Sequence, residues 1–285
     1  LFPYTTLFRS RNCPEGSLFI ALKGESFNGN AFAGKALEDG CAFAIIDEAQ
    51  YAIEGDRRYI LVNDCLQTLQ QLANYHRRQL GTRVIGITGT NGKTTTTMLV
   101  YHILKSAGLK VGLAGNVGNS LALQVATASF DYYVVELSSF QLDGMTEFKA
   151  DIAILLNITP DHLDRYDYNF QNYVDSKFKI TQNQTEQDAF IFWENDPVIK
   201  AELEKRNIHS AMYPFAIERS EKTKAFIEQE DLIIKSLKTL FTMPTSDLAL
   251  QGMHNTYNSM AAGLAASIVD VRKDNIRQSL QDFQG

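Results

Sequence analysis

The sequence predicts an α/β protein, in which a small N-terminal α/β domain precedes a P-loop-type, mostly parallel sheet with flanking helices. Three observations lead to this fold class. A glycine-rich segment, Gly86–Thr94, stands between an apolar run and an amphipathic helix, which is typical of a phosphate-binding loop. Short apolar runs alternate with helical patterns along the chain, which indicates parallel strands. The chain has 285 residues, enough for two domains of ordinary size.

Composition limits the classes of protein to consider. The formal net charge of -6 argues against a nucleic-acid binder with a broad basic surface. No apolar run is long enough to cross a bilayer, and the first ten residues lack the features of a signal peptide. The cysteines, Cys13, Cys41 and Cys65, show no metal-ligand spacing and suit free thiols in a reducing compartment. We therefore expect a cytoplasmic protein with no membrane span and no nucleic-acid partner.

Residues 11–82 are expected to form the small α/β domain. Its short apolar runs predict strands, and its amphipathic stretches predict helices. The polar, glycine-bearing segment Leu22–Asn30 predicts an ordinary turn. The expected elements are strand Ser17–Leu22, helix Ala31–Asp39, strands Ala42–Ile46 and Tyr59–Val62, and helix Cys65–Leu80.

Residues 83–285 are expected to form the second domain. Strand Arg83–Ile87 leads into the glycine-rich segment and helix Thr95–Ala107. The Ile, Ala and Leu residues of Asp151–Leu156 indicate a strand buried on both faces. The other expected elements are strands Lys110–Ala114, Tyr132–Glu136 and Ala189–Trp193, helices Leu121–Ala128, Asn169–Asn183, Pro197–Lys205, Asn255–Ile268 and Lys273–Phe283, and irregular strands and hairpins over Ser210–Leu240.

The glycine-rich segment predicts a nucleotide site. Its glycines let backbone N–H groups approach phosphate oxygens, and the helix that follows adds the partial positive charge of its N-terminus. Lys93 is expected to reach the terminal phosphates, and the Thr94 hydroxyl to hold Mg²⁺. The generic pattern has glycine at the position of Ile87, so the match is imperfect. The alternative is a simple glycine turn with a solvated Lys93.

Polar side chains follow two other expected strands. Glu136 ends one strand, and Asn157–Asp164, which includes Thr159, Asp161 and His162, follows another. The carboxyl ends of parallel strands meet at one edge of a sheet, where ligands bind. A carboxylate, a hydroxyl and an imidazole at this edge suit Mg²⁺ bound with a nucleotide. Taken alone, Glu136 is equally well a solvated acid and His162 a loop cap.

Two more motifs lie on expected helices. Lys177 lies in the middle of a helix, where a lysine is most often exposed to solvent. In Gly252–Asn258, the asparagines either cap the helix or offer amides to the edge of a base. The sequence alone favours the cap.

These motifs resemble those of the Mur ligase family, ATP-dependent enzymes that form amide bonds in peptidoglycan precursors. The resemblance covers nearly all of residues 11–285. Thr88–Thr94 is similar to the family's own phosphate loop, which explains the departure from the generic pattern. Glu136–Leu142, Asn157–Tyr166 and Gly252–Asn258 resemble the branch that adds D-glutamate to UDP-N-acetylmuramoyl-L-alanine, and Ser138–Leu142 is the most discriminating run.

The resemblance implies ATP and two Mg²⁺ ions as cofactors, and a monomer that binds the UDP-N-acetylmuramoyl substrate and D-glutamate. The implied chemistry is attack of the substrate carboxylate on the γ-phosphate of ATP, followed by attack of the amino group on the acyl phosphate. Lys177 matches a lysine that is carbamylated in the family. The implied catalytic residues are Lys93, His162 and Lys177; the ATP-binding residues are Gly89, Thr90, Asn91, Gly92, Lys93, Thr94, Thr95, Asn255 and Asn258; the substrate-binding residues are Asn116 and Ser138; and the metal ligands are Thr94, Glu136, His162 and carbamylated Lys177.

Departures from the family pattern lead to further expectations. Arg11–Asn30 resembles the UDP-binding domain of the branch that adds D-alanyl-D-alanine. We therefore expect a chimera joined at Thr88–Thr97, which amplification across Tyr75–Tyr101 from source DNA would test. Leu1–Ser10 resembles a translated sequencing adapter, and the family's C-terminal ligase domain is expected to be absent. Such a chain would bind Mg·ATP weakly at most and would not complete ligation.

Rival interpretations remain at this stage. The N-terminal domain alone favours the branch that adds D-alanyl-D-alanine. Folylpolyglutamate synthases share the ATP domain but lack this kind of N-terminal domain. A non-catalytic nucleotide-binding module is the alternative from another class, and the joint presence of Glu136, His162 and Lys177 favours an enzyme over it.

Overall fold

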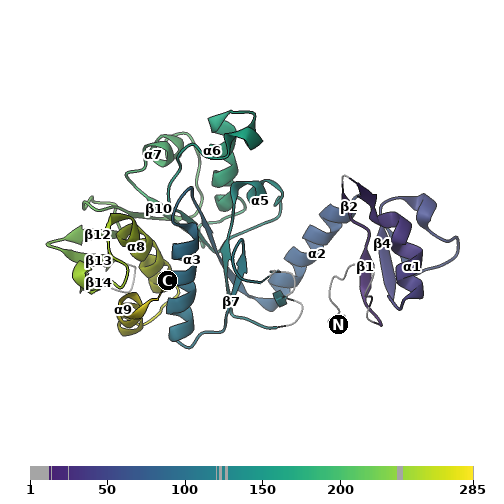
Figure 1. Ribbon diagram of the computed structural model, residues 1–285, viewed down its shortest axis with the longest axis horizontal. Helices are drawn as coiled ribbons and strands as arrows, with labels where there is room; N and C mark the ends of the chain where they lie inside the picture. Colours follow the sequence, from purple (N-terminus) through teal and green to yellow (C-terminus); the bar gives the residue numbers. More distant parts are fainter. Residues whose placement is uncertain are drawn as a thin grey trace. The chain divides into compact units, whose positions relative to one another are not determined.

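The computed structural model describes residues 13, 15–24, 26–119, 121, 124–125, 128–235 and 240–284. The chain divides into two compact units (Figure 1). The first comprises residues 1–81 and 120–129, and the second comprises residues 82–119 and 130–285. The adapter-like segment Leu1–Ser10 lies outside the described residues, as does much of the expected helix Leu121–Ala128.

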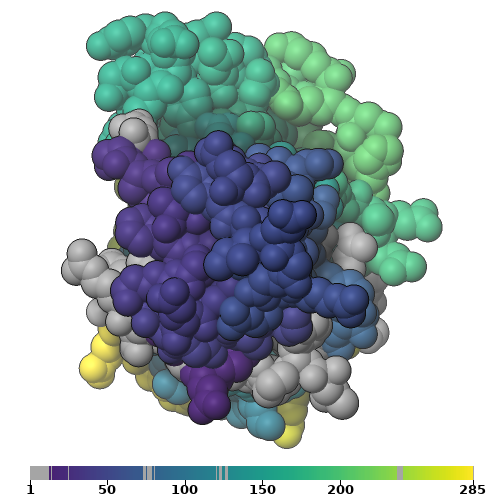
Figure 2. Space-filling view, turned by 90° about the vertical axis from the view of Figure 1, so that its right-hand side faces the viewer, coloured from purple at the N-terminus to yellow at the C-terminus, as the bar shows by residue number. Residues whose placement is uncertain are grey.

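The first unit contains a three-stranded parallel sheet in the order β1 (Leu18–Ile20), β4 (Phe43–Ile46), β5 (Tyr59–Leu61). Helices α1 (Ala33–Glu38) and α2 (Cys65–Leu80) follow β1 and β5 in the chain. Figure 2 shows the surface of this unit in purple to blue. Its buried core is small and consists of Phe19, Ile20, Ala21, Ala33, Ala36, Leu37, Cys41, Ala44, Ile45, Ile46 and Cys65.

The segment Leu22–Asn30 differs from the expected ordinary turn. It forms a short antiparallel hairpin, β2 (Lys23–Gly24) with β3 (Phe27–Asn28), which leads into the 3-10 turn η1 (Gly29–Phe32). At Gly29 an added Cβ would lie 2.4 Å from the carbonyl oxygen of Leu22, so only glycine fits this close approach. The sequence pattern could not show this, because the constraint comes from a backbone seven residues away. A second 3-10 turn, η2 (Ala49–Tyr51), follows β4.

The second unit is built on a nine-stranded sheet within the described residues. All neighbouring pairs from β7 to β12 are parallel, whereas β12–β13 and β13–β14 are antiparallel. The expected mostly parallel sheet is therefore confirmed. The order across the sheet is β14 (Leu240–Pro244), β13 (Asp231–Lys235), β12 (Ala225–Glu228), β11 (Ala211–Phe215), β10 (Ala189–Trp193), β9 (Ile152–Leu155), β6 (Arg83–Thr88), β8 (Tyr132–Glu136), β7 (Val111–Gly115).

Both faces of this sheet are covered. Alternate residues such as Ile85 and Ile87 share a core with helices α3 (Lys93–Ser106), α8 (Met253–Ile268) and α9 (Lys273–Asp282), which lie side by side in Figure 1. On the other face, Phe190 contacts Phe192 and Phe178, the last residue of α6. The remaining helices and turns are α5 (Ser139–Asp143), η3 (Leu163–Tyr166), α6 (Phe170–Phe178), η4 (Lys179–Thr181), α7 (Pro197–Leu203) and η5 (Thr245–Asp247).

The strand order explains where a ligand site can form. Strand β6 lies between β8 and β9, so the chain builds the sheet first to one side of β6 and then to the other. Ile87 pairs with Glu136, and Thr88 pairs with Leu155, so the carboxyl ends of the three strands meet. Such a switch point is where open α/β sheets bind ligands.

Some element boundaries differ from the sequence prediction. Helix α3 begins at Lys93 rather than Thr95, because Gly92 adopts a left-handed conformation (φ +80°) and starts the helix there. Helix α5 was not predicted; it is short and held by a capping box between Ser138 and Gln141.

The three cysteines are free thiols, as expected. Across the described residues, no helix combines the length and apolarity that a bilayer crossing requires.

Candidate functional site

The glycine-rich loop between β6 and α3 is held by the segment that follows β9. The side-chain oxygen of Asn157 accepts hydrogen bonds from the backbone N–H groups of Thr90 (3.1 Å) and Asn91 (2.8 Å). Its amide nitrogen donates to the carbonyl of Asn91 (3.1 Å). One side chain therefore fixes two consecutive peptide units of the loop. The sequence prediction included this segment but gave Asn157 itself no role.

Two lysine amines meet at the start of this loop. The Nζ atom of Lys93 donates to the carbonyl oxygens of Gly89 (3.0 Å) and Thr90 (2.7 Å). The Nζ atom of Lys177, from α6, donates to the same Gly89 oxygen at 2.7 Å. The side chain of Lys177 is only 2% exposed, so the expectation of a surface lysine was wrong. The structure thus brings together two of the three predicted catalytic residues.

Burial changes the proton affinity of both amines. The pKa of Lys177 is lowered to about 7, mainly by burial and also by the charge of Lys93, whereas Asp161 opposes the shift. Burial also lowers the pKa of Lys93, against the attraction of Glu136 and Asp161. A substantial fraction of Lys177 is therefore an uncharged amine near neutral pH, which is the nucleophilic form of a lysine.

Tyr173 connects Lys177 to the loop and was missed in the sequence prediction. Its ring centroid lies 4.6 Å from the Nζ atom of Lys177, and its hydroxyl lies 3.2 Å from the Thr90 hydroxyl. Thr90 in turn exchanges hydrogen bonds with the backbone of Thr159. The spacing of Tyr173 and Lys177, four residues apart on one helix, places them on one face and could have revealed the pair.

Glu136 ends β8 beside the loop, and its side chain is 1% exposed. Its Oε1 atom accepts a hydrogen bond from the side-chain amide of Asn116 (3.0 Å), whereas its buried Oε2 atom has no partner among the described residues. An unpaired carboxylate oxygen in the interior is costly unless a cation compensates it. The residue therefore fits a magnesium ion, which usually takes one or two carboxylates and keeps waters and phosphate oxygens as its other ligands.

Among the described residues, no hydrogen bond joins Glu136 to the other expected metal ligands. Thr94 is exposed in the first turn of α3. The imidazole of His162 is largely exposed, and its Nε2 atom lies 3.7 Å from Asp161. Over the part of the chain that the structure describes, no three His, Cys, Asp or Glu side chains form a ready-made metal centre. The metal-binding roles of Thr94 and His162 stay predictions.

Helix α8 brings Asn258 against the loop, and Asn255 lies one turn earlier on the same helix. The Oδ1 atom of Asn258 accepts a hydrogen bond from the Thr96 hydroxyl (3.1 Å). A Cβ added to Gly92 would lie 2.5 Å from the same atom. Asn255 donates to the carbonyl of Gln251 (2.9 Å) from within the helix, whose N-cap is Gly252. The interpretation of these asparagines as helix caps was therefore wrong.

Ser138 has a structural role in this arrangement. Its hydroxyl accepts a hydrogen bond from the backbone of Gln141, and its own N–H donates to the side chain of Gln141. This pair caps α5 directly after β8. The expected contacts of Ser138 and Asn116 with a substrate stay predictions.

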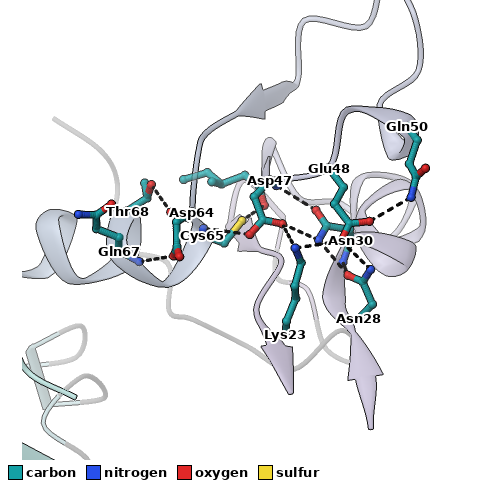
Figure 3. Close-up of polar contacts among 11 residues, drawn as sticks. Lys23, Asn28, Asn30, Asp47, Glu48, Gln50, Asp64, Cys65, Gln67 and Thr68 are labelled. Atoms are coloured by element: carbon teal, nitrogen blue, oxygen red, sulfur yellow. Dashed lines mark hydrogen bonds and ion pairs between the residues drawn. The ribbon is translucent and has the colours of Figure 1, made fainter. Parts of the chain in front are cut away.

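The first unit contains a separate polar network at the carboxyl ends of β1 and β4 (Figure 3). The amine of Lys23 lies 3.0 Å from Asp47 and 2.9 Å from Glu48. The buried side chain of Asn30 donates to the carboxylate of Asp47 (2.8 Å) and accepts from its backbone N–H (3.0 Å). Asn28 donates to Glu48 (3.1 Å). These groups satisfy one another, so the network fastens the hairpin to the strand that follows α1.

Family models match both parts of the chain. The Mur ligase middle domain matches residues 87–266, and the Mur ligase family catalytic domain matches residues 7–77. Several curated relatives bear the name UDP-N-acetylmuramoylalanine--D-glutamate ligase. The relative from Bacteroides fragilis is 58% identical over 208 residues, which cover 73% of this chain and 47% of the relative. The relative from Salinibacter ruber is 38% identical over 211 residues, which cover 71% of this chain and 46% of the relative. The chain thus spans about half the length of these relatives.

Solved structures share the fold. A MurF ligase from Thermotoga maritima in complex with ADP matches with a TM-score of 0.75 and 21% identity, covering 100% of this chain and 67% of that chain. A MurF from Acinetobacter baumannii matches with a TM-score of 0.72 and 24% identity, covering 98% of this chain and 62% of that chain. At these identities the likeness shows the fold alone.

Proposed function

The chain belongs to the Mur ligase family, and from this membership we propose that it is the nucleotide-binding part of a ligase that adds D-glutamate to UDP-N-acetylmuramoyl-L-alanine. The names of the relatives from Bacteroides fragilis and Salinibacter ruber support the substrate pair. One observation carries the catalytic proposal. The unpartnered Oε2 atom of Glu136 is buried at the end of the strand that pairs with β6, so a cation beside the phosphate loop would satisfy it.

Glu136 and Thr94 would hold Mg²⁺ in this proposal. The bound ion would neutralise charge on the phosphate oxygens. Lys93 would exchange its carbonyl partners, Gly89 and Thr90, for the phosphates. The substrate carboxylate would then attack the γ-phosphate of ATP and release ADP, and the amino group of D-glutamate would displace phosphate from the acyl phosphate and lose a proton. A second Mg²⁺, with His162 as a ligand, belongs to the same proposal.

Lys177 would act as a carbamate. Its uncharged amine would attack the carbon of CO₂ and lose a proton, which gives an anionic group in place of an ammonium. Burial near Lys93 supports this, because it depletes the ammonium form near neutral pH. Asn255 and Asn258 would contact adenine, and Asn116 and Ser138 would face the muramoyl substrate. A monomer in the cytoplasm, where ATP and UDP-linked precursors are used, completes the proposal.

Calorimetric titration with Mg·ADP tests the nucleotide site. The chain should bind Mg·ADP more tightly than ADP with a chelator, and Lys93→Ala should remove most of the affinity. Lys105→Ala is the matched control, since Lys105 lies on the same helix, is exposed and contacts the ring of Tyr101. Equal affinities for the Lys93→Ala and Lys105→Ala variants would contradict the assigned site.

Phosphate release tests the substrate assignment. Two mixtures are compared, each with a C-terminal ligase domain added in trans. One contains UDP-N-acetylmuramoyl-L-alanine and D-glutamate, and the other contains the UDP-N-acetylmuramoyl tripeptide and D-alanyl-D-alanine. The proposal expects release only with D-glutamate and its loss in Lys93→Ala. Nucleotide binding without turnover in either mixture would favour a non-catalytic module.

A further inference from the structure

Helices α5 and α6 are joined by a buried hydroxyl. The side chain of Ser176 donates to the carbonyl oxygen of Ser139 over 2.6 Å, and both residues are buried. Ser139 opens α5, three residues after Glu136, and Ser176 directly precedes Lys177 on α6. The two helices lie beside one another in Figure 1. This single hydrogen bond therefore joins the segment that carries the unpaired carboxylate to the segment that carries the buried amine.

Tyr166 reinforces the joint. Its hydroxyl lies 3.2 Å from the Ser176 hydroxyl and 2.9 Å from the carboxylate of Asp143. Ser176 gives its one proton to Ser139, so its oxygen is left as an acceptor, and Tyr166 divides its single proton between this oxygen and the Asp143 carboxylate. The Asp143 carboxylate also pairs with Lys179 at 2.6 Å. The contacts run from α5 through η3 to the end of α6, so they hold Ser176 in one orientation.

We propose that Ser176 is a positioning residue, whose hydrogen bond to Ser139 holds the amine of Lys177 between the Gly89 carbonyl and the ring of Tyr173. The importance of that position for ligation rests on the proposed function; the position itself does not. Ser176 contacts neither the loop nor the predicted nucleotide and metal ligands through any hydrogen bond that its hydroxyl makes. It acts through the placement of its neighbour in the sequence.

The opposite side of α6 has a different fastening. Arg206 pairs with Asp175 and Glu202, and its guanidinium lies 4.5 Å from the ring of Phe178. These contacts tie α6 to α7, away from α5. On the side that faces α5, polar contacts of Ser176, Tyr166 and Lys179 join the two helices. Removing the Ser176 hydroxyl should therefore let α6 shift while the helix stays attached to the unit.

Proton NMR of the Lys177 side chain in the purified chain tests the proposal. Its ε-methylene protons, assigned by their loss in Lys177→Met, should be shifted upfield by the Tyr173 ring, whose centroid lies 4.6 Å from Nζ. Ser176→Ala should remove most of this ring-current shift, and Ser176→Thr, which keeps the hydroxyl, should restore at least half of it. Ser210→Ala is the matched control, because Ser210 is also buried and donates one hydrogen bond, to Gln184 at 2.9 Å.

The control separates positioning from general loss of stability. Both alanine variants should lower the thermal midpoint, but only Ser176→Ala should move the Lys177 signals. Unchanged signals in Ser176→Ala, or the same change in Ser210→Ala, would overturn the proposal. If Ser176→Ala does not fold, Tyr166→Phe replaces it and should reduce the shift; an unchanged shift in that variant would equally overturn the proposal. Failure of the chain to bind Mg·ADP would count against the proposed function and would leave this result standing.

Discussion

Lys93 and Lys177 donate to the same acceptor, the carbonyl oxygen of Gly89, at 3.0 and 2.7 Å. Two amines at one carbonyl repel each other when both are charged, and this repulsion adds to the cost of burying Lys177. A phosphate beside the loop would draw Lys93 away from this carbonyl. A carbamate on Lys177 would be repelled by the same oxygen and would also leave it. Two amines therefore share this carbonyl in the chain without ligands, and each proposed ligand would remove one amine from it and so remove the repulsion.

The first prediction concerns stability and pH. The pKa of Lys177 is about 7 in the folded chain, below the ordinary value of 10.5, so the folded state binds this proton less well than the unfolded state. The charged amine therefore destabilises the folded chain by its full amount below pH 7, and this destabilisation disappears as the pH rises from about 7 to about 10.5. Lys177→Met should therefore raise the free energy of unfolding by roughly 2–4 kcal/mol at pH 6, after allowance for lost contacts. The increase in the free energy of unfolding should become steadily smaller between pH 7 and pH 10.

Urea unfolding in CO₂-free buffer at several pH values measures this effect. Lys105→Met provides the control, because Lys105 is exposed on α3 and its removal should leave the pH profile of the wild-type chain unchanged. A difference between the Lys177→Met variant and the wild-type chain that stays constant from pH 6 to pH 10 would show that Lys177 keeps an ordinary pKa.

The second prediction concerns Asn157. Asn157→Ala removes the acceptor of two loop N–H groups and the donor to Asn91. Lost hydrogen bonds of this kind cost about 1–2 kcal/mol, so the affinity for Mg·ADP should fall roughly tenfold as the loop loses its preformed shape. Calorimetry on the variant and on Asn207→Ala, an exposed asparagine on the chain after α7, measures the difference. Equal affinities would mean that the loop keeps its shape without Asn157.

The sequence located the loop and the acid of this site because both follow from local patterns. Gly89, Gly92 and Lys93 lie in one short motif, and Glu136 ends an apolar strand. The burial of Lys177 could not be predicted in the same way. Its position depends on the packing of α6 against the loop, whereas a lysine in a helical pattern is usually exposed. The role of Asn157 depends on the pairing of β9 with β6, which sequence periodicity does not specify.

The short elements, helix α5 and the hairpin of β2 and β3, could not be predicted from the sequence for a similar reason. Helix α5 has five residues, too few to show helical periodicity, and its stability comes from the capping box of Ser138 and Gln141. The hairpin of β2 and β3 has two residues in each strand. Alternation of apolar and polar residues cannot be recognised over two residues, so the segment resembled a turn.

The third prediction concerns the first unit. Asn30→Ala leaves the backbone N–H of Asp47 without its acceptor and removes one donor to the Oδ1 atom of Asp47, which keeps Lys23 as its other partner. The unit should lose about 2–3 kcal/mol of stability, since a buried polar group left unpaired costs its full desolvation. Gln50→Ala removes an exposed contact to Glu48 in the same network and should change stability by less than about 0.5 kcal/mol. Hydrogen exchange of β4 amides reports on this unit separately; equal protection in both variants would contradict the prediction.

The fourth prediction separates two reasons for glycine at position 92. Its φ of +80° strains any other residue, and an added Cβ would also lie 2.5 Å from Oδ1 of Asn258. Gly108→Ala isolates the first reason, because Gly108 has φ +82° and open space around its Cβ position. It should cost about 1–2 kcal/mol. Gly92→Ala should cost more, by roughly 1–3 kcal/mol, because the overlap forces Asn258 to move.

A double-mutant cycle assigns the excess. In an Asn258→Ala background the clash is gone, so Gly92→Ala should cost only the conformational strain measured at Gly108. Urea unfolding of the four chains of the cycle gives the coupling free energy directly. A coupling near zero would mean that Asn258 rotates away at no cost, and its hydrogen bond to Thr96 would then contribute little to holding it at the loop. A coupling above about 1 kcal/mol would show that α8 fixes Asn258 firmly against the loop, as the proposed contact of Asn258 with adenine would require.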